Sequence, residues 1–328
     1  MALAPIGSRG GTRPLKYDLF NQHTIQAEVG FGGTGLHSGA QVNVVLRPAP
    51  PDHGIVFHRV DQPWAPRIPA RYDRVVDTSL ATVIGGGGVT VGTIEHFMAA
   101  ARVVGIDNLC VEIDGPEMPV LDGSAAPFLD IFKQAGLRAQ GAVKTCLRIE
   151  HSFMVQHGDA FIKVRPADAL HIHYTIEFPH PLVGRQSYKW TLEAGTFARE
   201  LAGARTFGFL KDVQYLQSKG LALGGSLENA VVFDEHGVLN GEGLRFGDEC
   251  VRHKVLDFIG DLALCPFPVF GAFEVHKGGH ALHNRLLREM FQRPGYARFV
   301  TPAPLMPSAR VGGPLPSLYW EPLSLKRS

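Results

Sequence analysis

The chain has 328 residues, of which 45% are hydrophobic and 19% charged, and its 32 Lys and Arg balance 31 Asp and Glu to a net charge of +1. This composition excludes a disordered chain, and the near-neutral charge argues against a nucleic-acid binder that works by broad phosphate neutralisation. The length is typical of two domains, and 38 Gly with 23 Pro favour a turn-rich mixed fold over a helical bundle.

The N-terminal segment and the cysteines indicate a cytoplasmic protein. Residues 1–20 contain no continuous apolar stretch or cleavage site, so we expect a flexible tail and no signal peptide. No run in the chain approaches the ~20 apolar residues that a membrane span requires. None of the 4 cysteines belongs to a CxxC pair, and we expect all of them to be buried and reduced. They are Cys110, Cys146, Cys250 and Cys265.

Alternating and periodic hydrophobic segments predict the elements of the first half. The segments predicted as strands are 41–46, 55–57, 79–84 and 108–113. A helix is predicted over about 93–104, because Ile94, Phe97 and Met98 recur at helical spacing. A second helix is predicted to start near Ser124, with a proline in its first turn.

The pattern restarts after residues 137–146, which we predict to be a linker. Strands are predicted at 147–155, 160–165, 171–178, 186–192, 229–233 and 269–275. Helices are predicted near 195–203, 209–219, 250–264 and 281–291. Each half therefore runs strands, helix, strand, helix, which predicts an α+β fold of two similar domains, 21–140 and 147–302, rather than a doubly wound parallel sheet. Residues 303–328 are predicted to be an irregular tail.

One glycine motif matches the sequence of a nucleotide-binding loop but lacks the helix that should follow such a loop. Gly30 to Gly35 fits GxGxxG, whose pyrophosphate site needs a strand before the motif and a helix after it. The residues that follow predict a strand, so we interpret these as turn glycines. HExxH and GxSxG are both absent, and the absence of GxSxG disfavours a serine hydrolase.

A polar stripe on the helix predicted at 250–264 suggests a metal site. His253, Asp257 and Asp261 recur every four residues, about 200° from the apolar stripe of the same helix. A solvated face would explain such a stripe, but solvated faces usually mix Lys and Glu, whereas a His and a carboxylate four apart can reach one metal ion. His96 on another helix adds a third candidate ligand, and Glu95 beside it is a candidate base. Two His and one carboxylate leave a fourth position open for water, as in catalytic zinc sites.

Several segments in both halves carry a resemblance to one family. They are GLHSG (35–39), TIEH (93–96), GIDN (105–108), LDGSAAPF (121–128), ARTFGF (204–209), LALGGSLENAVV (221–232), VRHKVLD with GDLAL (251–264) and KGGHAL (277–282). Over about residues 22–300 the chain resembles UDP-3-O-acyl-N-acetylglucosamine deacetylases, the zinc enzymes of the committed step of lipid A synthesis. The resemblance implies a cytoplasmic monomer of two α+β domains, with the active site between the domains and an insert in each.

The resemblance also implies the catalytic roles. One zinc ion would be held by three ligands, His96, His253 and Asp257. Glu95 would be the general base, and Thr206 would help to bind the carbonyl oxygen of the substrate. The cationic partner would be His280, oriented by Asp261. Two positions depart from the family pattern: Gly279 replaces a usual serine and His283 a usual asparagine.

The substrate implied by the resemblance is an acylated UDP-sugar. Lys254 and Lys277 would lie near the diphosphate, and Phe178 would stack on uracil. The other implied substrate-binding residues, chiefly along a hydrophobic passage for the acyl chain, are Phe207, Leu210, Val213, Leu216, Leu227, Ala230 and Val232. From the spacing of the apolar residues alone, a small satellite core explains residues 209–232 better than a passage does.

Amide hydrolysis suits this set of residues. Zinc polarises a carbonyl and lowers the pKa of bound water to about 7, and His280 kept protonated by Asp261 can protonate the leaving amine. The products would be acetate and the free 2-amino sugar nucleotide. One alternative is a zinc amidase that acts on a different acylated sugar. Another is a UDP-sugar binding protein without activity, against which the intact Glu95 and ligand set argue.

Overall fold

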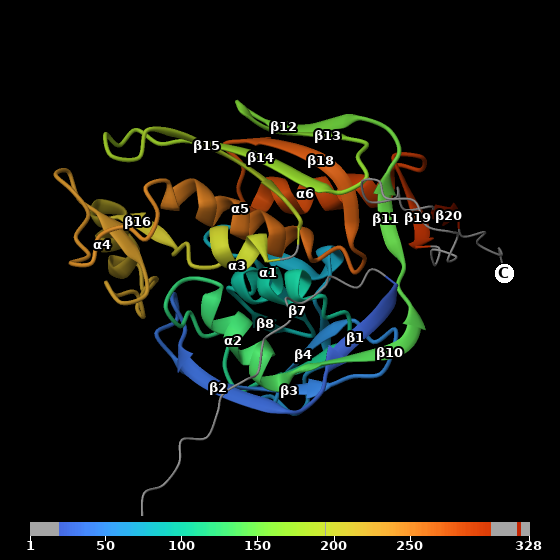
Figure 1. Ribbon diagram of the computed structural model, residues 1–328. Coiled ribbons are helices and arrows are strands. Elements are labelled where there is room, and N and C mark those ends of the chain that lie inside the picture. Colours follow the sequence, from blue (N-terminus) through green and yellow to red (C-terminus); the bar gives the residue numbers. More distant parts are fainter. Residues whose placement is uncertain (1–19, 194, 303–319, 323–328) are drawn as a thin grey trace, which may run out of the picture.

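The computed structural model describes residues 20–193, 195–302 and 320–322 of the chain. It confirms the predicted α+β class: helices lie in the middle of the molecule, with one main sheet on either side of them (Figure 1). Within these ranges, no helix is both long and apolar enough to cross a membrane. The four cysteines are free and buried, as predicted.

The first main sheet is built from the first half of the chain. Its five strands run in the order β2-β3-β9-β4-β5. Their bounds are β2 Val29–Thr34, β3 Gln41–Pro48, β4 Ile55–Arg59, β5 Ile68–Pro69 and β9 Leu109–Ile113. In β3 the side chains of Val42, Val44 and Leu46 are buried and their neighbours are more exposed, which is the alternation that predicted this strand.

Gly30, Gly32 and Gly33 of the glycine motif lie inside β2, so their interpretation as turn glycines is wrong, while Gly35 begins the turn after the strand. β2 pairs with β3 along its whole length, and a Cβ atom at Gly32 would lie 2.9 Å from Asn43 Oδ1. The absence of a side chain at Gly32 therefore leaves room for the Asn43 side chain of the neighbouring strand. A strand rather than a helix follows the motif, which agrees with our exclusion of a dinucleotide site.

A small three-stranded sheet joins the first main sheet to α1. It consists of β6 Val75–Asp77, β7 Val83–Gly86 and β8 Val89–Val91, and β6 follows the short 3-10 helix η1 Tyr72–Arg74. The strand predicted at 79–84 thus begins only at Val83, because residues 79–82 form a bend whose last residue, Thr82, turns toward the interior.

The second main sheet has eight strands, with β18 at its centre. The strand bounds are β11 Cys146–Ile149, β12 Phe153–His157, β13 Ala160–Arg165, β14 Leu170–Glu177, β15 Arg185–Thr191, β18 Val269–His276, β19 Ala297–Pro302 and β20 Trp320–Pro322. The predicted strand 147–155 is divided into β11 and β12. Part of the tail predicted to be irregular forms β20, which pairs with β19. The rest of that tail, and residues 1–19 of the expected flexible tail, lie outside the described residues.

Most of the segment predicted to be a linker, residues 137–146, forms a strand. Leu137–Val143 form β10, which pairs antiparallel with β1 (Asn21–Ile25). β10 has no fully buried side chain, so it lacks the hydrophobic alternation by which the other strands are recognised.

The predicted helices are all present, with shifted ends. Their bounds are α1 Glu95–Val104, α2 Ala126–Ala135, α3 Thr196–Glu200, α4 Leu210–Ser218, α5 Glu249–Leu262 and α6 His280–Gln292. α4 packs beside a pair of short parallel strands, β16 Phe207–Phe209 and β17 Val231–Phe233. This unit protrudes from one end of the molecule (Figure 1).

Helices α1 and α5 cross very closely. A Cβ atom built at Gly260 of α5 would lie 1.9 Å from the carbonyl oxygen of Glu95, the first residue of α1. Nearly every residue of α5 is buried, so the helix cannot tilt into solvent to make room. Only glycine allows this approach of one backbone to another.

We predict that Gly260→Ala lowers the free energy of unfolding by at least ~3 kcal/mol, because the added methyl group meets backbone atoms that cannot move aside. Urea denaturation monitored by circular dichroism measures the change. Gly241→Ala is the matched control, since a Cβ atom there has no neighbour within 4 Å. Equal stability of the two variants would contradict the close crossing.

Candidate active site

Three buried side chains converge between α1 and α5. His96 comes from the first turn of α1, and His253 and Asp257 come from successive turns of α5. The Oδ1 atom of Asp257 lies 3.4 Å from His96 Nε2 and 3.2 Å from His253 Nε2. The close crossing of the two helices therefore brings together the three residues that were predicted as metal ligands.

The hydrogen bonding of this cluster fits a metal ion. His253 Nδ1 lies 3.1 Å from the carbonyl oxygen of Ala204, which can only accept, so Nδ1 carries the proton. Burial lowers the pKa of His253 to about 4, so the ring is neutral and its Nε2 presents a lone pair toward Asp257. Among the described residues, no side chain donates a hydrogen bond to the buried Oδ1 atom of Asp257. Electron pairs that face each other in an apolar interior require a cation between them, and two His with one carboxylate suit zinc.

The other carboxylate oxygen of Asp257 has a strong partner. Lys254 Nζ lies 2.5 Å from Oδ2, which orients the carboxylate and leaves Oδ1 for the histidines. Although burial opposes ionisation, the positive charges of Lys254 and His280 help to hold the pKa of Asp257 well below its usual range. The carboxylate is therefore ionised, as a metal ligand must be.

Glu95 lies beside this cluster without a cation in direct contact. Its Oε2 accepts the backbone N–H of Thr82 at 3.1 Å, and its Oε1 lies 3.8 Å from His280 Nε2. Burial raises the pKa of Glu95, and the neighbouring His280 and His96 only moderate this effect. A carboxylate with raised proton affinity is suited to accept a proton near neutral pH.

A second cluster forms around Asp261, one turn beyond Asp257. Its Oδ2 lies 2.7 Å from His280 Nδ1 and 2.7 Å from His283 Nδ1, and its Oδ1 accepts the hydroxyl of Thr82. Burial opposes a charge on His280, but Asp261 raises the pKa of His280 to about 9. His280 is therefore a cation at neutral pH, close to Glu95.

Both clusters border one cavity of about 540 Å³, a size typical of small-molecule sites. The predicted site residues that line it are Glu95, His96, Phe178, Thr206, Phe207, Val213, Leu216, His253, Lys254, Asp257 and His280. Asp261 lies behind His280. Lys277 does not line the cavity, and its ammonium pairs with Asp159 at 2.5 Å. Leu210, Leu227, Ala230 and Val232 lie outside the lining as well.

Three residues of the site gave no clear signal in the sequence. Thr82 contacts both Glu95 and Asp261, but it stands in an apolar stretch that looks like a strand. His283 was noticed only as a departure from the family pattern. His37 lines the cavity from a glycine-rich turn, where a histidine is more often simply exposed.

The start of α1 is held in a strained conformation. Thr93 has φ 54°, an unusual value for a β-branched residue, and its hydroxyl donates to Glu117 Oε1 at 2.7 Å. The same carboxylate accepts the backbone N–H groups of His37 and Ser38. Glu117 thus connects the glycine-rich turn to Thr93, which precedes Glu95 and His96 on α1. Backbone strain like that of Thr93 is often found at functional sites.

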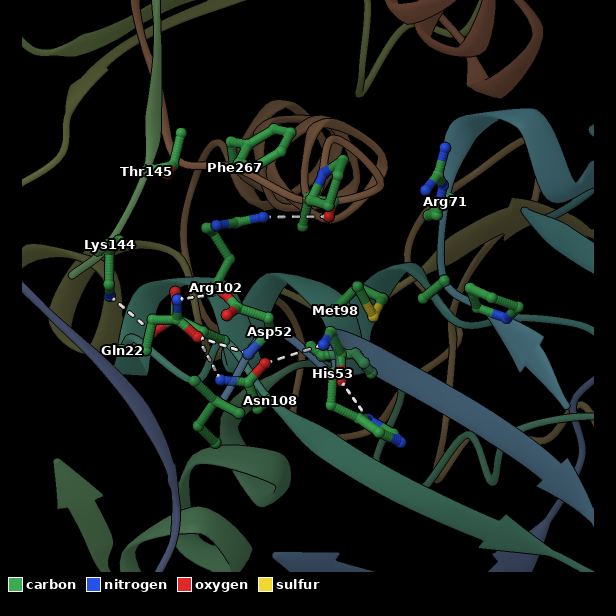
Figure 2. Close-up of a pocket in the computed structure, with 18 residues that line it drawn as sticks. Gln22, Asp52, His53, Arg71, Met98, Arg102, Asn108, Lys144, Thr145 and Phe267 are labelled. Carbon is green, nitrogen blue, oxygen red and sulfur yellow. Dashed lines mark hydrogen bonds and ion pairs between the residues drawn. The ribbon is translucent and has the colours of Figure 1, made fainter. Parts of the chain in front are cut away.

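A second cavity, of about 360 Å³, lies near the C-terminal ends of α1 and α5 (Figure 2). Arg102 crosses it and donates to the carbonyl oxygens of Ala263 and Cys265, which follow α5. Lys144 in its wall pairs with Asp107 at 2.9 Å. None of the predicted site residues lines this cavity, and the two hydrogen bonds of Arg102 join α1 to the segment that follows α5.

The chain is similar to known proteins over most of its length. The family model for LpxC, UDP-3-O-acyl N-acetylglycosamine deacetylase, matches residues 22–292. A UDP-3-O-acyl-N-acetylglucosamine deacetylase of Myxococcus xanthus is 51% identical over 282 residues, which cover 86% of this chain and 89% of that protein. A protein of the same name from Oleidesulfovibrio alaskensis is 51% identical over 268 residues (82% and 88%). One from Haemophilus influenzae is 43% identical over 286 residues (86% and 94%).

We predict that Asp261→Asn lowers the pKa of His280 from about 9 to its ordinary 6.5 or below, because burial then acts without the opposing carboxylate. Histidine NMR of the metal-free protein measures this change. Because the raised pKa stabilises the folded state, the free energy of unfolding of the wild type should fall as the pH rises from 6.5 through about 9, and the variant should lack this fall.

The matched control is Asp159→Asn. Asp159 is the exposed ion-pair partner of Lys277, and this variant removes its charge. The titration of His280 should not change in this control. A His280 that still titrates near pH 9 in Asp261→Asn would show that Asp261 does not hold its proton.

Proposed function

The chain belongs to the family of UDP-3-O-acyl-N-acetylglycosamine deacetylases, and from this premise we propose that it hydrolyses the 2-acetamido group of UDP-3-O-acyl-N-acetylglucosamine. The products are acetate and UDP-3-O-acyl-glucosamine, and the reaction is the committed step of lipid A biosynthesis. The observation that carries the proposal is the Oδ1 atom of Asp257, which has no hydrogen-bond partner within the described part of the chain. It faces two histidines beside a buried Glu95 and a cationic His280.

We assign one zinc ion to His96, His253 and Asp257. When bound there, zinc supplies a Lewis acid that polarises the amide carbonyl and lowers the pKa of water. The chain prepares the ligands through their outer contacts: the carbonyl of Ala204 selects the tautomer of His253, and Lys254 orients Asp257.

Glu95 and His280 divide the proton transfers. Glu95 accepts the proton of the attacking water, since burial raises its pKa and no cation is in direct contact with it. The water oxygen adds to the carbonyl carbon, and the hydroxyl of Thr206 donates to the oxygen that gains charge, a contribution of about 3 kcal/mol. The carbon–nitrogen bond then breaks, and His280 gives its proton to the leaving amine. Asp261 keeps that proton available at neutral pH.

The walls of the cavity suit the remaining parts of the substrate. The ring centroids of Phe178 and Phe207 lie 5.5 Å apart, and we place the uracil against this aromatic wall. Lys254 and Lys277 supply positive charge for the diphosphate. Val213 and Leu216 of α4 face the cavity and begin the passage for the acyl chain. We place the rest of that passage along Leu210, Leu227, Ala230 and Val232.

We further propose that the molecule consists of two domains, residues 21–140 and 147–302, with the site between them. The two main sheets support this division, because each takes its strands from one side of residue 140. The sheet of β6, β7 and β8 corresponds to the insert of the first domain, and the unit of β16, α4 and β17 to that of the second. The four free thiols are in keeping with a cytoplasmic enzyme.

The first test separates the base from the metal ligands. We predict that Glu95→Gln keeps stoichiometric zinc and lowers kcat by about 10²–10⁴, because the general base is lost while the ligands remain. His253→Ala should instead lose the metal and stay folded, since a core of this size does not depend on an ion. Zinc analysis, circular dichroism and an acetate-release assay give the three readouts. Zinc loss in proportion to activity in Glu95→Gln would make Glu95 a ligand.

The second test concerns the acyl chain. Each buried CH₂ group contributes about 0.8 kcal/mol, so removal of a long 3-O-acyl chain should lower kcat/KM by several orders of magnitude. We predict that Leu216→Gln impairs the acylated substrate far more than UDP-N-acetylglucosamine. Leu239→Gln is the control, because Leu239 is 38% exposed and does not line the cavity. Equal turnover of the two substrates by the wild type would favour an amidase for a different sugar.

A further inference from the structure

A buried chain of hydrogen bonds leads from the second main sheet to His280. The hydroxyl of Tyr174, in β14, lies 3.2 Å from His283 Nε2, and His283 Nδ1 lies 2.7 Å from Asp261 Oδ2. The same carboxylate oxygen accepts His280 Nδ1 at 2.7 Å. Tyr174 is 0% exposed and His283 1%, so water does not compete for these contacts.

The two ends of this chain determine the tautomer of His283. The carboxylate of Asp261 can only accept, so His283 Nδ1 carries a proton. Burial lowers the pKa of His283, which leaves its ring neutral and its Nε2 an acceptor. The hydroxyl of Tyr174 is the donor that satisfies Nε2. Tyr174 thus donates to His283 Nε2, and His283 Nδ1 donates to Asp261, with no exchange of donor and acceptor possible along the chain.

The contacts hold the carboxylate of Asp261 on every side. Its Oδ2 accepts from two residues of α6, and its Oδ1 accepts from Thr82, in the loop before β7. A carboxylate with this many donors cannot rotate away from His280 without losing a buried hydrogen bond. Of these three donors, His283 is the one that has a side-chain hydrogen bond to the second main sheet within the described residues.

Gly278 provides the space for this arrangement. A Cβ atom there would lie 2.8 Å from the Tyr174 hydroxyl and 2.9 Å from His283 Nε2. The neighbouring Gly279 has no such constraint, because its Cβ atom would meet nothing within 4 Å. Gly278 does not adopt a left-handed φ, so its lack of a side chain matters for space rather than for backbone conformation.

We propose that His283 is a positioning residue of the active site, which holds Asp261 against His280 and is itself held by Tyr174 in a space that only Gly278 leaves open. The inference rests on the proposed roles of Asp261 and His280. The charged and titratable groups that face this unit are Glu95 from α1, Lys254 and Asp257 from α5, and His37 from the turn before β3. None of them is a direct hydrogen-bond partner of His283 within the described residues.

Two substitutions separate the effect of the hydrogen-bond donor of His283 from the effect of its side-chain volume. In His283→Asn the amide nitrogen can occupy the place of Nδ1 and still donate to Asp261, whereas His283→Leu cannot donate. We expect His283→Leu to lower kcat by about 10- to 100-fold with little change in KM, as for a lost hydrogen bond to a charged group. The alkaline limb of its pH profile should move to higher pH, because a less satisfied Asp261 holds the His280 proton more tightly. His283→Asn should keep the wild-type limb.

The control for packing alone is Leu286→Ala on the same helix, where a buried side chain is also lost. It should reduce thermal stability without moving the alkaline limb. Equal loss of kcat in His283→Leu and His283→Asn, or an unmoved limb in His283→Leu, would overturn the positioning role. An inactive wild type would contradict the proposed function instead, and the tautomer of His283 would then be read by nitrogen NMR. A proton on Nε2 rather than Nδ1 would overturn the inference without any assay.

A double-mutant cycle tests the part of Gly278. Gly278→Ser should destabilise the wild type, because the added atoms meet His283 Nε2 and the Tyr174 hydroxyl. In the His283→Asn background the first of these contacts is absent, so the same substitution should cost less. The contact with Val275 is common to both backgrounds and cancels in the cycle. Additive effects on the thermal midpoint would show that Gly278 does not make room for His283.

Discussion

The approach of Gly260 to the backbone of Glu95 controls the geometry of the whole site. Asp257 lies one turn before Gly260 on α5 and Asp261 follows it directly, while Glu95 and His96 begin α1. Any added distance between the helices therefore separates His96 from Asp257 and also separates Glu95 from Asp261, the α5 residue that holds His280. The two sheets pack outside these helices and hold them together, so the protein core supports the position of a few reactive atoms (Figure 1).

The charges around these helices are arranged so that one carboxylate remains reactive. Asp257 is matched by Lys254, and Asp261 by His280, which keeps both carboxylates ionised in spite of burial. Glu95 has the backbone N–H of Thr82 as its hydrogen-bond donor, and its nearest cationic atom is 3.8 Å away. The same degree of burial thus suits the three carboxylates to the proposed roles of ligand, orienting group and base, because their partners differ.

Periodicity along the sequence predicts which side chains share one face of a helix or strand. It does not predict which distant segment that face contacts. It identified the stripe of His253, Asp257 and Asp261, because all three belong to one helix. It could not identify Thr82, which meets Asp261 over a separation of 179 residues. It also missed β10, whose exposed residues leave no hydrophobic pattern, and misread the glycines of β2, which face a neighbouring strand. Family motifs supplied roles for the site, yet the contact of His283 with Tyr174 required the packed structure.

The division of the site between α1 and α5 has a consequence during synthesis. A ribosome completes His96 and the first main sheet long before it completes Asp257. Until α5 emerges, the nascent chain has one of the three proposed ligands and leaves uncovered the surface of α1 that α5 later buries. Such incomplete intermediates are prone to aggregation and are typical clients of chaperones. Completion of the proposed metal site and protection of α1 thus become coupled steps, both of which wait for the second half of the chain.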